Sequence, residues 1–449
     1  MASMATDLNA AQQVLDRLLE RFRTRSARIG VIGLGYVGLP LLLLFEESGF
    51  EVVGFDTDAA KVEALTRRES YIRHIAGERI EKAFAGSRAS TTTSFDVLTS
   101  CDAVIVCVPT PLGRHREPDL QYVRATARAV ADNLRLGQLI VLESTTYPGT
   151  TREELLPLLE AGGLMCGRDF FLAFSPERED PGNPKFNTKT IPKIVGGIDE
   201  PSLRAAVALY SAAVDHVVPV PTTEIAESAK LLENIFRAVN IALVNELKVV
   251  FERMGIDIWQ VIEAAKTKPF GFMPFYPGPG LGGHCIPLDP FYLTWKAAEH
   301  GLWARFIELA GEVNTSMPYY VVDRTVAALN ADRKSVNGAN VLVLGLSYKP
   351  DIDDDRESPS FEIIELLRER GASVAYCDPY VPVARRGRKH DIRLASVSCT
   401  PDEFAKYDAV VVSTPHAQFK DPALYAKVRL AIDTRNIVPR NAGARVFRA

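Results

Sequence analysis

Short apolar runs rich in valine and isoleucine alternate with helical patterns through the first half of the chain. They lie at 28–33, 51–56, 103–108, 139–142, 170–174, 193–197 and 216–220. This alternation predicts parallel strands wound with helices, an α/β sheet of the nucleotide-binding kind. We expect this sheet to form a domain over residues 28–221.

The pattern changes at Thr222. From there to Met254 no glycine or proline interrupts the chain, and apolar residues recur at helical spacing. A helix of about 30 residues spans roughly 45 Å, a length typical of a rod that joins two domains and offers a dimer surface. Three further helical patterns lie at 257–266, 290–300 and 303–332. We therefore predict a central helical dimerisation domain over 222–332.

Residues 333–449 return to strands and helices. VLVLGLSY is expected to form a strand and turn, 359–370 a helix, and SVAYCDP, DAVVVST and VRLAIDT three more strands. This predicts a second, smaller α/β domain without the glycine fingerprint of the first. Residues 1–27 form a separate extension, a short amphipathic helix. Its apolar stripe is expected to pack against the main body, with a partner helix as the alternative; it comprises Val14, Leu15, Leu18, Leu19 and Phe22.

Composition excludes several classes of protein. A length of 449 residues suits two or three domains, and 47% apolar with 24% charged residues is ordinary for a globular enzyme. The net charge of −4 gives no basic field for nucleic acid, and no uncharged apolar stretch of about 18 residues predicts a membrane span. Six cysteines without a C-x-x-C pair suggest neither a zinc site nor a disulfide framework. We expect a reducing, cytoplasmic setting.

A glycine motif follows the first apolar run. Gly33, Gly35 and Gly38 have the G-x-G-x-x-G spacing, with Tyr36 and Val37 between them and an apolar helix pattern after them. The first glycine permits a tight turn, the second lets the backbone approach a pyrophosphate, and the third allows close helix–strand packing. The helix N-terminus supplies N–H donors for the phosphates. The motif predicts a dinucleotide site.

An acidic residue stands where this site needs one. Asp56 ends the second apolar run, 18 residues after Gly38, in the position of an acid that binds the adenosine ribose hydroxyls. No arginine adjoins Asp56, so NAD is favoured over NADP. Thr110 and Thr145 follow the next two runs, at strand ends where ligands bind in open α/β sheets, although ordinary turn chemistry explains them equally well.

Glycine and proline surround one cysteine in the segment PGPGLGGHCIPLDP, residues 277–290. Glycine is unfavourable in a packed core, so the segment predicts a shaped loop near Cys285. On the residues alone, Cys285 is either a nucleophile with a stabilised thiolate or a buried, inert thiol. The adjacent His284 does not imply a Cys–His couple, because consecutive side chains usually point apart.

Eight motifs in order give the chain a family resemblance from about Arg28 to Arg448. They are GLGYVG, VPTP, EST, SPER, AESAKLLEN, GGHCIPLD, YKPDIDDDRESP and DTRN. The chain resembles the UDP-glucose/GDP-mannose dehydrogenase family. The resemblance implies an NAD-binding domain, a helical linker that forms a homodimer, and a C-terminal domain that binds the nucleotide sugar. It also implies a four-electron oxidation at C6 that uses two NAD and one water.

The resemblance assigns roles to residues that match the family motifs. Cys285 would attack the C6 aldehyde to give a thiohemiacetal, which the second hydride transfer turns into a thioester. Lys230 and Asn234, at i and i+4 of one helix face, would stabilise an oxyanion at C6. Asp289 would work with a water in proton transfer. Without the resemblance, Lys230 reads as a solvated side chain and Asp289 as a helix cap.

Further residues would hold the water and the ligands. Thr145 would position the water, and Glu177 would assist thioester hydrolysis. Cofactor contacts are expected from Gly33, Gly35, Tyr36, Val37, Gly38, Asp56, Thr110, Thr145 and Arg356. Substrate contacts are expected from Glu177, Arg178, Lys230, Asn234, Gly282, Lys349 and Arg435. The acidic run 351–355 is expected to be solvated, and no metal is predicted.

Two positions depart from many glucose-specific members of the family. Pro181 stands where a second glutamate is common, and Leu288 where a lysine is common. The motif style is similar to that of the bacterial branch acting on UDP-N-acetylhexosamines. We therefore expect UDP-N-acetylhexosamine or UDP- or TDP-glucose as substrate.

Two other functions remain open. One is a one-step NAD-dependent hydroxyacid dehydrogenase with Lys230 as acid and base, and the other is a non-catalytic NAD-sensing protein. The yield of NADH per sugar distinguishes the three functions, because it would be two, one or none.

Overall fold

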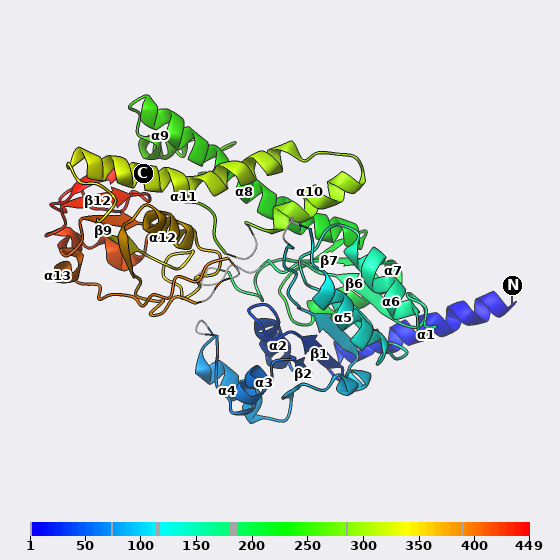
Figure 1. Cartoon of the computed structure of the whole chain (residues 1–449). Coiled ribbons are helices and arrows are strands. Elements are labelled where there is room, and N and C mark those ends of the chain that lie inside the picture. Colours follow the sequence, from blue (N-terminus) through cyan, green and yellow to red (C-terminus); the bar gives the residue numbers. More distant parts are fainter. Residues whose placement is uncertain are drawn as a thin grey trace. The chain divides into compact units, whose positions relative to one another are not determined.

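The computed structural model describes residues 2–72, 75–113, 117–178, 186–283, 286–385, 387 and 389–449. The chain folds into two compact units, each with its own β-sheet and covering helices (Figure 1). The first unit comprises Met1–Glu233 and Trp295–Gly301, and the second comprises Asn234–Thr294 and Leu302–Ala449.

The first unit is built on an eight-stranded sheet in the order β3-β2-β1-β4-β5-β6-β7-β8. Its strands are β1 Arg28–Ile32, β2 Glu51–Phe55, β3 Ala89–Thr92, β4 Ala103–Val106, β5 Leu139–Leu142, β6 Phe171–Phe174, β7 Lys193–Gly197 and β8 Val217–Val220. Ile29 of β1 pairs with Val52 of β2 and with Ala103 of β4, which places β1 between them. The carboxyl ends of β1, β4 and β5 therefore lie at one edge of the sheet.

Helix α2 (Gly38–Glu47) is buried along almost its whole length. Its sequence GLPLLLLFEE is apolar on every side until the end, as expected of a helix enclosed by other elements. Phe22 of α1 (Ala2–Arg23) and Tyr210 of α7 (Glu200–Ser211) belong to the same hydrophobic core as Phe45 of α2. Leu15 and Leu18 of α1 are also buried, so the expectation that this stripe packs on the main body is confirmed. The remaining helical elements of this part are α3 Ala59–Thr66, α4 Gly77–Ala85, η1 Phe95–Ser100, α5 Gln121–Ala131, η2 Thr151–Leu155 and α6 Leu156–Glu160.

The second unit has a five-stranded parallel sheet in the order β10-β9-β11-β12-β13. Its strands are β9 Asn340–Leu344, β10 Ser373–Cys377, β11 Ala409–Val412, β12 Leu430–Asp433 and β13 Arg445–Arg448. Successive side chains of a strand point to opposite faces. Val341 and Val343 accordingly join the core beside α12 (Pro359–Glu369), whereas Leu342 and Leu344 join the core on the other face.

Two long helices lie side by side in the second unit, namely α11 (Arg305–Ala331) and the part of α8 (Thr223–Arg253) that follows Glu233 (Figure 1). Asn314 of α11 donates to Ala238 O of α8 at 3.0 Å and accepts from Asn245 Nδ2 at 3.0 Å. These are buried amide groups, and each hydrogen bond satisfies a group that would be costly to leave unpaired. The other helical elements are α9 Ile258–Ala265, α10 Asp289–Glu299, α13 Pro401–Phe404, η3 Ala417–Lys420 and η4 Pro422–Tyr425.

The start of α8 belongs to the first unit and is held there by Glu227. This fully buried carboxylate accepts from Gly149 N at 2.6 Å, from Thr151 N at 2.9 Å and from Thr151 Oγ1 at 2.7 Å. Burial raises the pKa of Glu227 to about 7, although the three donors oppose the rise. The carboxylate thus satisfies the free N–H groups at the start of η2.

The fold prediction of two α/β sheets joined by a helical region with a long helix is confirmed. One pairing differs, because β6 and β7 pair antiparallel, so β7 and β8, which are parallel to each other, run opposite to the other six strands of the sheet. An antiparallel pair needs no crossover helix between its strands, unlike the parallel pairs that flank it. Strands β3 and β13 were not predicted. The boundaries of the three domains and the extension stay a prediction.

Among the described residues, none of the helices is both long enough and apolar enough to cross a membrane.

Candidate active site

The glycine motif forms the turn between β1 and α2. Gly33 has φ +92°, and a Cβ there would lie 2.4 Å from Cys107 O. A Cβ on Gly38 would lie 1.9 Å from Gly33 O, so the turn packs tightly on itself. At Gly35, by contrast, a Cβ would meet nothing within 4 Å, so the backbone faces open space. The residues therefore fit a pyrophosphate held at the start of α2, with Val37 as its N-cap and the partly buried Tyr36 beside it.

Asp56 lies directly beside this turn. Its Oδ2 accepts from Leu34 N at 2.9 Å, and its Oδ1 accepts from Asp58 N at 2.9 Å. Lys61 Nζ lies 3.0 Å from Asp56 Oδ2, a contact that sequence reasoning missed because Lys61 belongs to the following helix α3. The carboxylate is fixed at the end of β2, in place for the ribose hydroxyls of a dinucleotide.

Replacing Asp56 with asparagine is expected to reduce discrimination between NAD and NADP. The wild-type carboxylate repels a 2′-phosphate, and asparagine removes that charge while it keeps the shape of the side chain. The ratio of kcat/KM for the two cofactors measures the effect. We expect a marked NAD preference in the wild type, and parity in the wild type would contradict the assignment of Asp56. Lys61→Ala is the matched control, because it removes the counter-charge and should strengthen the preference.

The loops after β4 and β5 are joined by hydrogen bonds. Thr110 Oγ1 donates to Thr145 O at 2.7 Å, and Ser144 Oγ donates to Val108 O at 2.7 Å. The structure therefore brings together Thr110 and Thr145, the two threonines predicted from strand ends. Both loops lie at the edge of the sheet where ligands bind in open α/β folds.

The segment after β6 carries Glu177 and Arg178. Arg178 donates to both oxygens of Glu233, at 2.6 and 3.3 Å, and to Pro192 O at 2.7 Å. Glu177 Oε2 lies 3.9 Å from Lys193 Nζ. The guanidinium of Arg178 is thus already held by α8, whereas Glu177 lies beside a buried ammonium that the sequence did not single out.

Lys230 and Asn234 are one turn apart on α8. Lys230 is only 7% exposed, and no described residue accepts a hydrogen bond from its ammonium. Asn234 is fully buried and donates from Nδ2 to Asp289 Oδ2 at 2.6 Å. Arg237, which sequence reasoning missed, donates to Asn234 Oδ1. Because Arg237 occupies the amide oxygen, the amide nitrogen is directed at Asp289.

Cys285 and His284 lie outside the described residues. The chain just before them packs closely against the second unit's sheet loops. A Cβ on Gly282 would lie 2.6 Å from Tyr348 Cβ, and Gly283, with φ +83°, donates from its N to Arg356 O at 3.0 Å. Glycine is required at both positions, which supports the expectation of a shaped loop.

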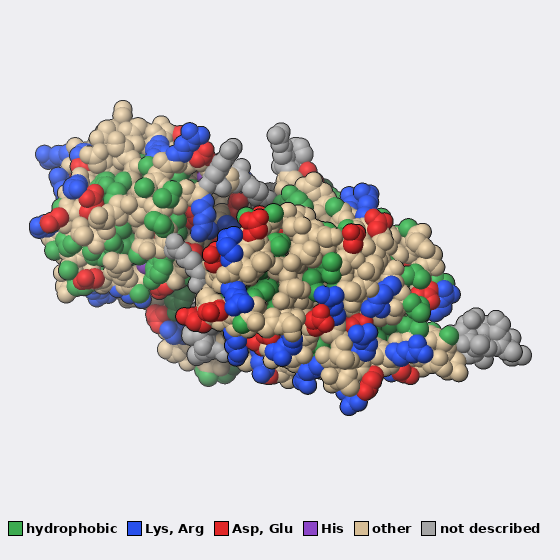
Figure 2. Space-filling model, turned by 90° about the horizontal axis from the view of Figure 1, so that it is seen from below, with side chains coloured by type: hydrophobic (Ala, Val, Ile, Leu, Met, Phe, Trp, Pro, Cys, Tyr) green, Lys and Arg blue, Asp and Glu red, His purple; other side chains and the backbone are tan. Residues whose placement is uncertain are grey.

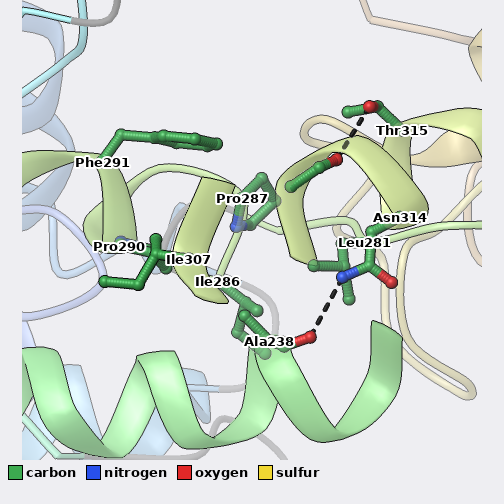
Figure 3. Close-up of a pocket in the computed structure, with 10 residues that line it drawn as sticks. Ala238, Leu281, Ile286, Pro287, Pro290, Phe291, Ile307, Asn314 and Thr315 are labelled. Carbon is green, nitrogen blue, oxygen red and sulfur yellow. Dashed lines mark hydrogen bonds between the residues drawn. The ribbon is translucent and has the colours of Figure 1, made fainter. Parts of the chain in front are cut away.

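A mainly apolar cavity of about 90 Å³ lies between this loop, α10, α11 and α8 (Figure 3). Ile286 and Pro287, the first described residues after Cys285, line it together with Phe291 and Ile307. Thr315 Oγ1 donates to Gly311 O across its wall, and Asn314 donates to Ala238 O at its base. This cavity could not be predicted from local sequence patterns, because its lining comes from three separate segments of the chain.

The C-terminal basic residues have different surroundings. Arg356 forms a forked ion pair with Asp354, in which Nη2 lies 2.6 Å from Oδ2. Arg435 donates from Nε to Ser413 O at 2.9 Å, and burial lowers the pKa of its guanidinium to about 10.

Lys349 lies two residues before the acidic run 351–355. The expectation that this run is solvated is wrong for Asp354 and Asp355, which are buried. Arg356 pairs with Asp354, and Arg385 N donates to Asp355 at 3.0 Å.

One cluster of possible metal ligands occurs among the described residues. Oxygen or nitrogen atoms of Glu362, Glu365 and His390 lie within 4.8 Å of one another. His390 Nδ1 lies 2.6 Å from Glu365 Oε2, and Nε2 lies 3.6 Å from Glu362 Oε2. Each ring nitrogen already faces a carboxylate, so His390 is held between the two glutamates. On the molecular face in Figure 2, charges of both signs are interspersed, in keeping with the small net charge.

The predicted site residues thus fall on both units. The first unit holds the glycine turn, Asp56, Thr110, Thr145, Glu177, Arg178 and Lys230, and the second holds Asn234, Gly282, Asp289, Lys349, Arg356 and Arg435. Within them, the structure pairs Thr110 with Thr145 and Asn234 with Asp289.

Comparison with known proteins covers nearly the whole chain. Its relatives include the UDP-N-acetyl-D-glucosamine 6-dehydrogenase of Pseudomonas aeruginosa, 36% identical over 399 residues, with coverage of 88% of this chain and 92% of that protein. A UDP-N-acetyl-D-mannosamine dehydrogenase of Pyrococcus horikoshii is 35% identical over 432 residues, with coverage of 94% and 98%.

Solved structures agree. The UDP-D-ManNAc dehydrogenase from Pyrococcus horikoshii matches with a TM-score of 0.85 at 33% identity, covering 94% of this chain and 98% of that one. A UDP-glucose dehydrogenase from Pyrobaculum islandicum matches with a TM-score of 0.82 at 28% identity, covering 94% and 97%.

Three domain models of one family match in order along the chain. The UDP-glucose/GDP-mannose dehydrogenase NAD binding domain matches residues 27–214, the central domain 224–316 and the UDP binding domain 342–440. The predicted use of NAD is confirmed, because the first of these domains is the one that binds it. The chain therefore belongs to the UDP-glucose/GDP-mannose dehydrogenase family and is an NAD-dependent oxidoreductase.

Proposed function

We propose that the protein oxidises the C6 hydroxyl of a UDP-N-acetylhexosamine to a carboxylate, with Cys285 as a covalent relay. The observation that carries the proposal is the buried hydrogen bond between Asn234 and Asp289. It joins the turn of α8 after Lys230 to the residue four positions beyond Cys285. The substrate class is supported by the names of the relatives, which act on UDP-N-acetylglucosamine and UDP-N-acetylmannosamine.

The second oxidation needs a relay, because the aldehyde carbon is a poor hydride donor until a nucleophile adds to it and makes it tetrahedral. NAD, when bound, accepts one hydride in each of two oxidations. In the proposal the Cys285 thiolate attacks the C6 aldehyde, and the resulting thiohemiacetal carries the hydrogen that the second oxidation removes. Water then cleaves the thioester to give the acid and free the thiol. The overall change consumes one alcohol, two NAD⁺ and one water, and it releases the carboxylate, two NADH and three protons.

The chain's own groups would serve these steps in turn. The Lys230 ammonium and the Asn234 amide would stabilise the oxyanion at C6, as preorganised donors do. Asp289 would exchange protons with a water that Thr145 positions, and Glu177 would assist the water that cleaves the thioester. Lys349 and Arg435 would hold the nucleotide part of the substrate, and Arg356 the cofactor phosphates.

The test is a stoichiometric assay on a panel of nucleotide sugars. The protein is incubated with NAD and each of the UDP-N-acetylhexosamines, UDP-glucose and TDP-glucose, and NADH is counted per sugar consumed. Two NADH per UDP-N-acetylhexosamine support the proposal. One NADH would favour the one-step dehydrogenase, none would favour an NAD-sensing protein, and a preference for UDP- or TDP-glucose would correct the substrate.

The proposal includes a homodimer formed on α8, in a cytoplasmic setting. Phe236, Leu243 and Val250 recur every seven residues, and 46%, 52% and 45% of their surfaces are exposed. A regular apolar stripe on a long helix is the surface that a second helix covers in helix pairs.

Replacing Leu243 with arginine is therefore expected to shift the protein from dimer to monomer. The charge would have to be buried without a partner in the middle of the interface. Sedimentation velocity at micromolar concentration measures the change. The control is Val383→Arg, at an exposed apolar position away from α8, which should sediment as the wild type does. A wild-type protein that is monomeric and fully active would contradict the homodimer.

A further inference from the structure

A buried cluster of charge lies behind Glu177 in the first unit. Lys193, the first residue of β7, extends its ammonium to within 2.8 Å of Glu143 Oε2 and 3.9 Å of Glu177 Oε2. Glu143 follows β5, and its other oxygen accepts from Tyr210 Oη of α7. The side chains of Lys193 and Glu143 are 6% and 0% exposed, and that of Glu177 is 14% exposed. One ammonium is therefore shared between a fully buried carboxyl and one that reaches the surface.

The electrostatics of the cluster keep Lys193 charged. Burial by itself would lower the pKa of Lys193, but Glu143 and Glu177 outweigh it, and the pKa ends above its usual value. Burial raises the pKa of Glu143 against the attraction of Lys193. Burial also raises the pKa values of Tyr210 and of the nearby Cys107 thiol, so both stay neutral. Arg178, next to Glu177, is occupied by Glu233. Lys193 is thus the cation that faces Glu177 within the cluster.

The ammonium also holds the backbone that carries Glu177. Lys193 Nζ donates to Pro176 O at 3.5 Å, and Ser175 Oγ donates to Ile194 O at 2.8 Å. The chain after β6 is in this way attached to β7 through both of the residues that precede Glu177. Tyr210 donates to Glu143, and Glu143 in turn holds the ammonium of Lys193. The position of Glu177 therefore depends on buried groups.

We propose that Lys193, anchored by Glu143, is the positioning residue of Glu177 and holds its carboxylate ready for thioester hydrolysis. The inference rests on the proposed function, in which Glu177 assists that hydrolysis. An ammonium about 4 Å from a carboxylate attracts it and restricts its orientation, as a general base directed at one water requires. The residue acts through Glu177 and touches neither sugar nor cofactor.

Two substitutions that change the charge facing Glu177 in opposite directions test the inference. In Glu143→Gln, the ammonium of Lys193 faces one carboxylate, Glu177, instead of two. The acid limb of the pH–rate profile for acid release should therefore move to lower pH. The double variant Lys193→Met/Glu143→Gln removes the ammonium together with its buried partner, so no unpaired charge is left inside. Its acid limb should move to higher pH by about 1 unit.

The readout separates hydrolysis from oxidation. In single turnovers followed by NADH absorbance, both hydride transfers should keep their wild-type rates in the double variant. Acid release should slow by about tenfold, less than the roughly 100-fold that loss of a general base costs, because Glu177 itself remains, and a thioester adduct should accumulate in intact mass spectra. KM for the sugar nucleotide should not change. Lys193→Arg retains the charge and should keep the wild-type profile.

Glu177→Gln separates this inference from the proposed function. Wild-type acid release by Glu177→Gln would remove Glu177 from the mechanism, and the proposed function would be wrong on that point. Slow release by Glu177→Gln, with acid limbs unmoved in Glu143→Gln and in the double variant, would overturn the role of Lys193 alone. Should the double variant not fold, as judged by circular dichroism, Glu143→Gln decides by itself: a shift to lower pH supports the inference, and an unmoved limb refutes it.

Discussion

Replacing Cys285 with alanine is expected to abolish acid formation while substrate and NAD still bind. Without the thiol no thiohemiacetal forms, so any turnover should stop at the aldehyde with one NADH per sugar. Acid production is measured by product mass, and binding of substrate and NAD by titration calorimetry. Wild-type-like acid production by this variant would show that the thiol is not the relay.

Serine at the same position gives a different expected result. Its hydroxyl can still add to the aldehyde, but it is a weaker nucleophile, and an oxygen ester is a poorer acyl intermediate here than a thioester. We expect slow NADH release and a sugar adduct on the chain, visible in intact mass spectra. Cys166→Ser is the matched control, since Cys166 is a free thiol in the first unit with no proposed role and should leave turnover unchanged.

Replacing Lys230 with alanine is expected to lower kcat by about 100- to 1000-fold, the usual cost of losing one oxyanion donor. Lys230 is 7% exposed, and its ammonium makes no hydrogen bond to any described residue, as suits a donor reserved for a ligand. The loss should affect both hydride transfers, whereas loss of Cys285 affects only the second. Single-turnover NADH traces distinguish the two patterns.

The control for Lys230 is Arg253→Ala, which removes an exposed cation from the end of the same helix. It should leave kcat within the experimental error of the wild type. A Lys230→Ala variant whose first hydride transfer runs at the wild-type rate would contradict the role in oxyanion stabilisation, because that donor is needed from the first step.

Much of the fold could be predicted because buried parallel strands are apolar on both faces and stand out as continuous runs. Strands β3 and β13 lack this signal. They are the polar sequences ASTT and RVFR at the edges of their sheets, and half or more of their residues are exposed or partly exposed. Their strand conformation depends on pairing with β2 and β12, and this pairing cannot be predicted from the local sequence pattern.

The candidate site could be predicted residue by residue, but its contacts could not. Motifs name Asp56, Glu177 and Asn234, yet the charged residues beside them lie outside those motifs. Lys193 is 50 residues from Glu143 in sequence, and they meet only because β5 and β7 lie in one sheet. The acidic run 351–355 was predicted to be solvated because its composition is typical of a protein surface. Two of its carboxylates are nevertheless buried, since Asp354 pairs with Arg356 and Asp355 accepts from a backbone amide.

The buried Glu227 has a thermodynamic consequence for the first unit. Its pKa rises from 4.5 to about 7 on folding, so the folded chain takes up a proton that the unfolded chain has already released between these pH values. The stabilisation associated with this proton is present in full below pH 4.5 and is lost as the pH rises through about 7. The difference is on the order of 3 kcal/mol, so the fold around Glu227 is more stable in mildly acidic than in alkaline solution, because proton uptake relieves the cost of burying this carboxylate.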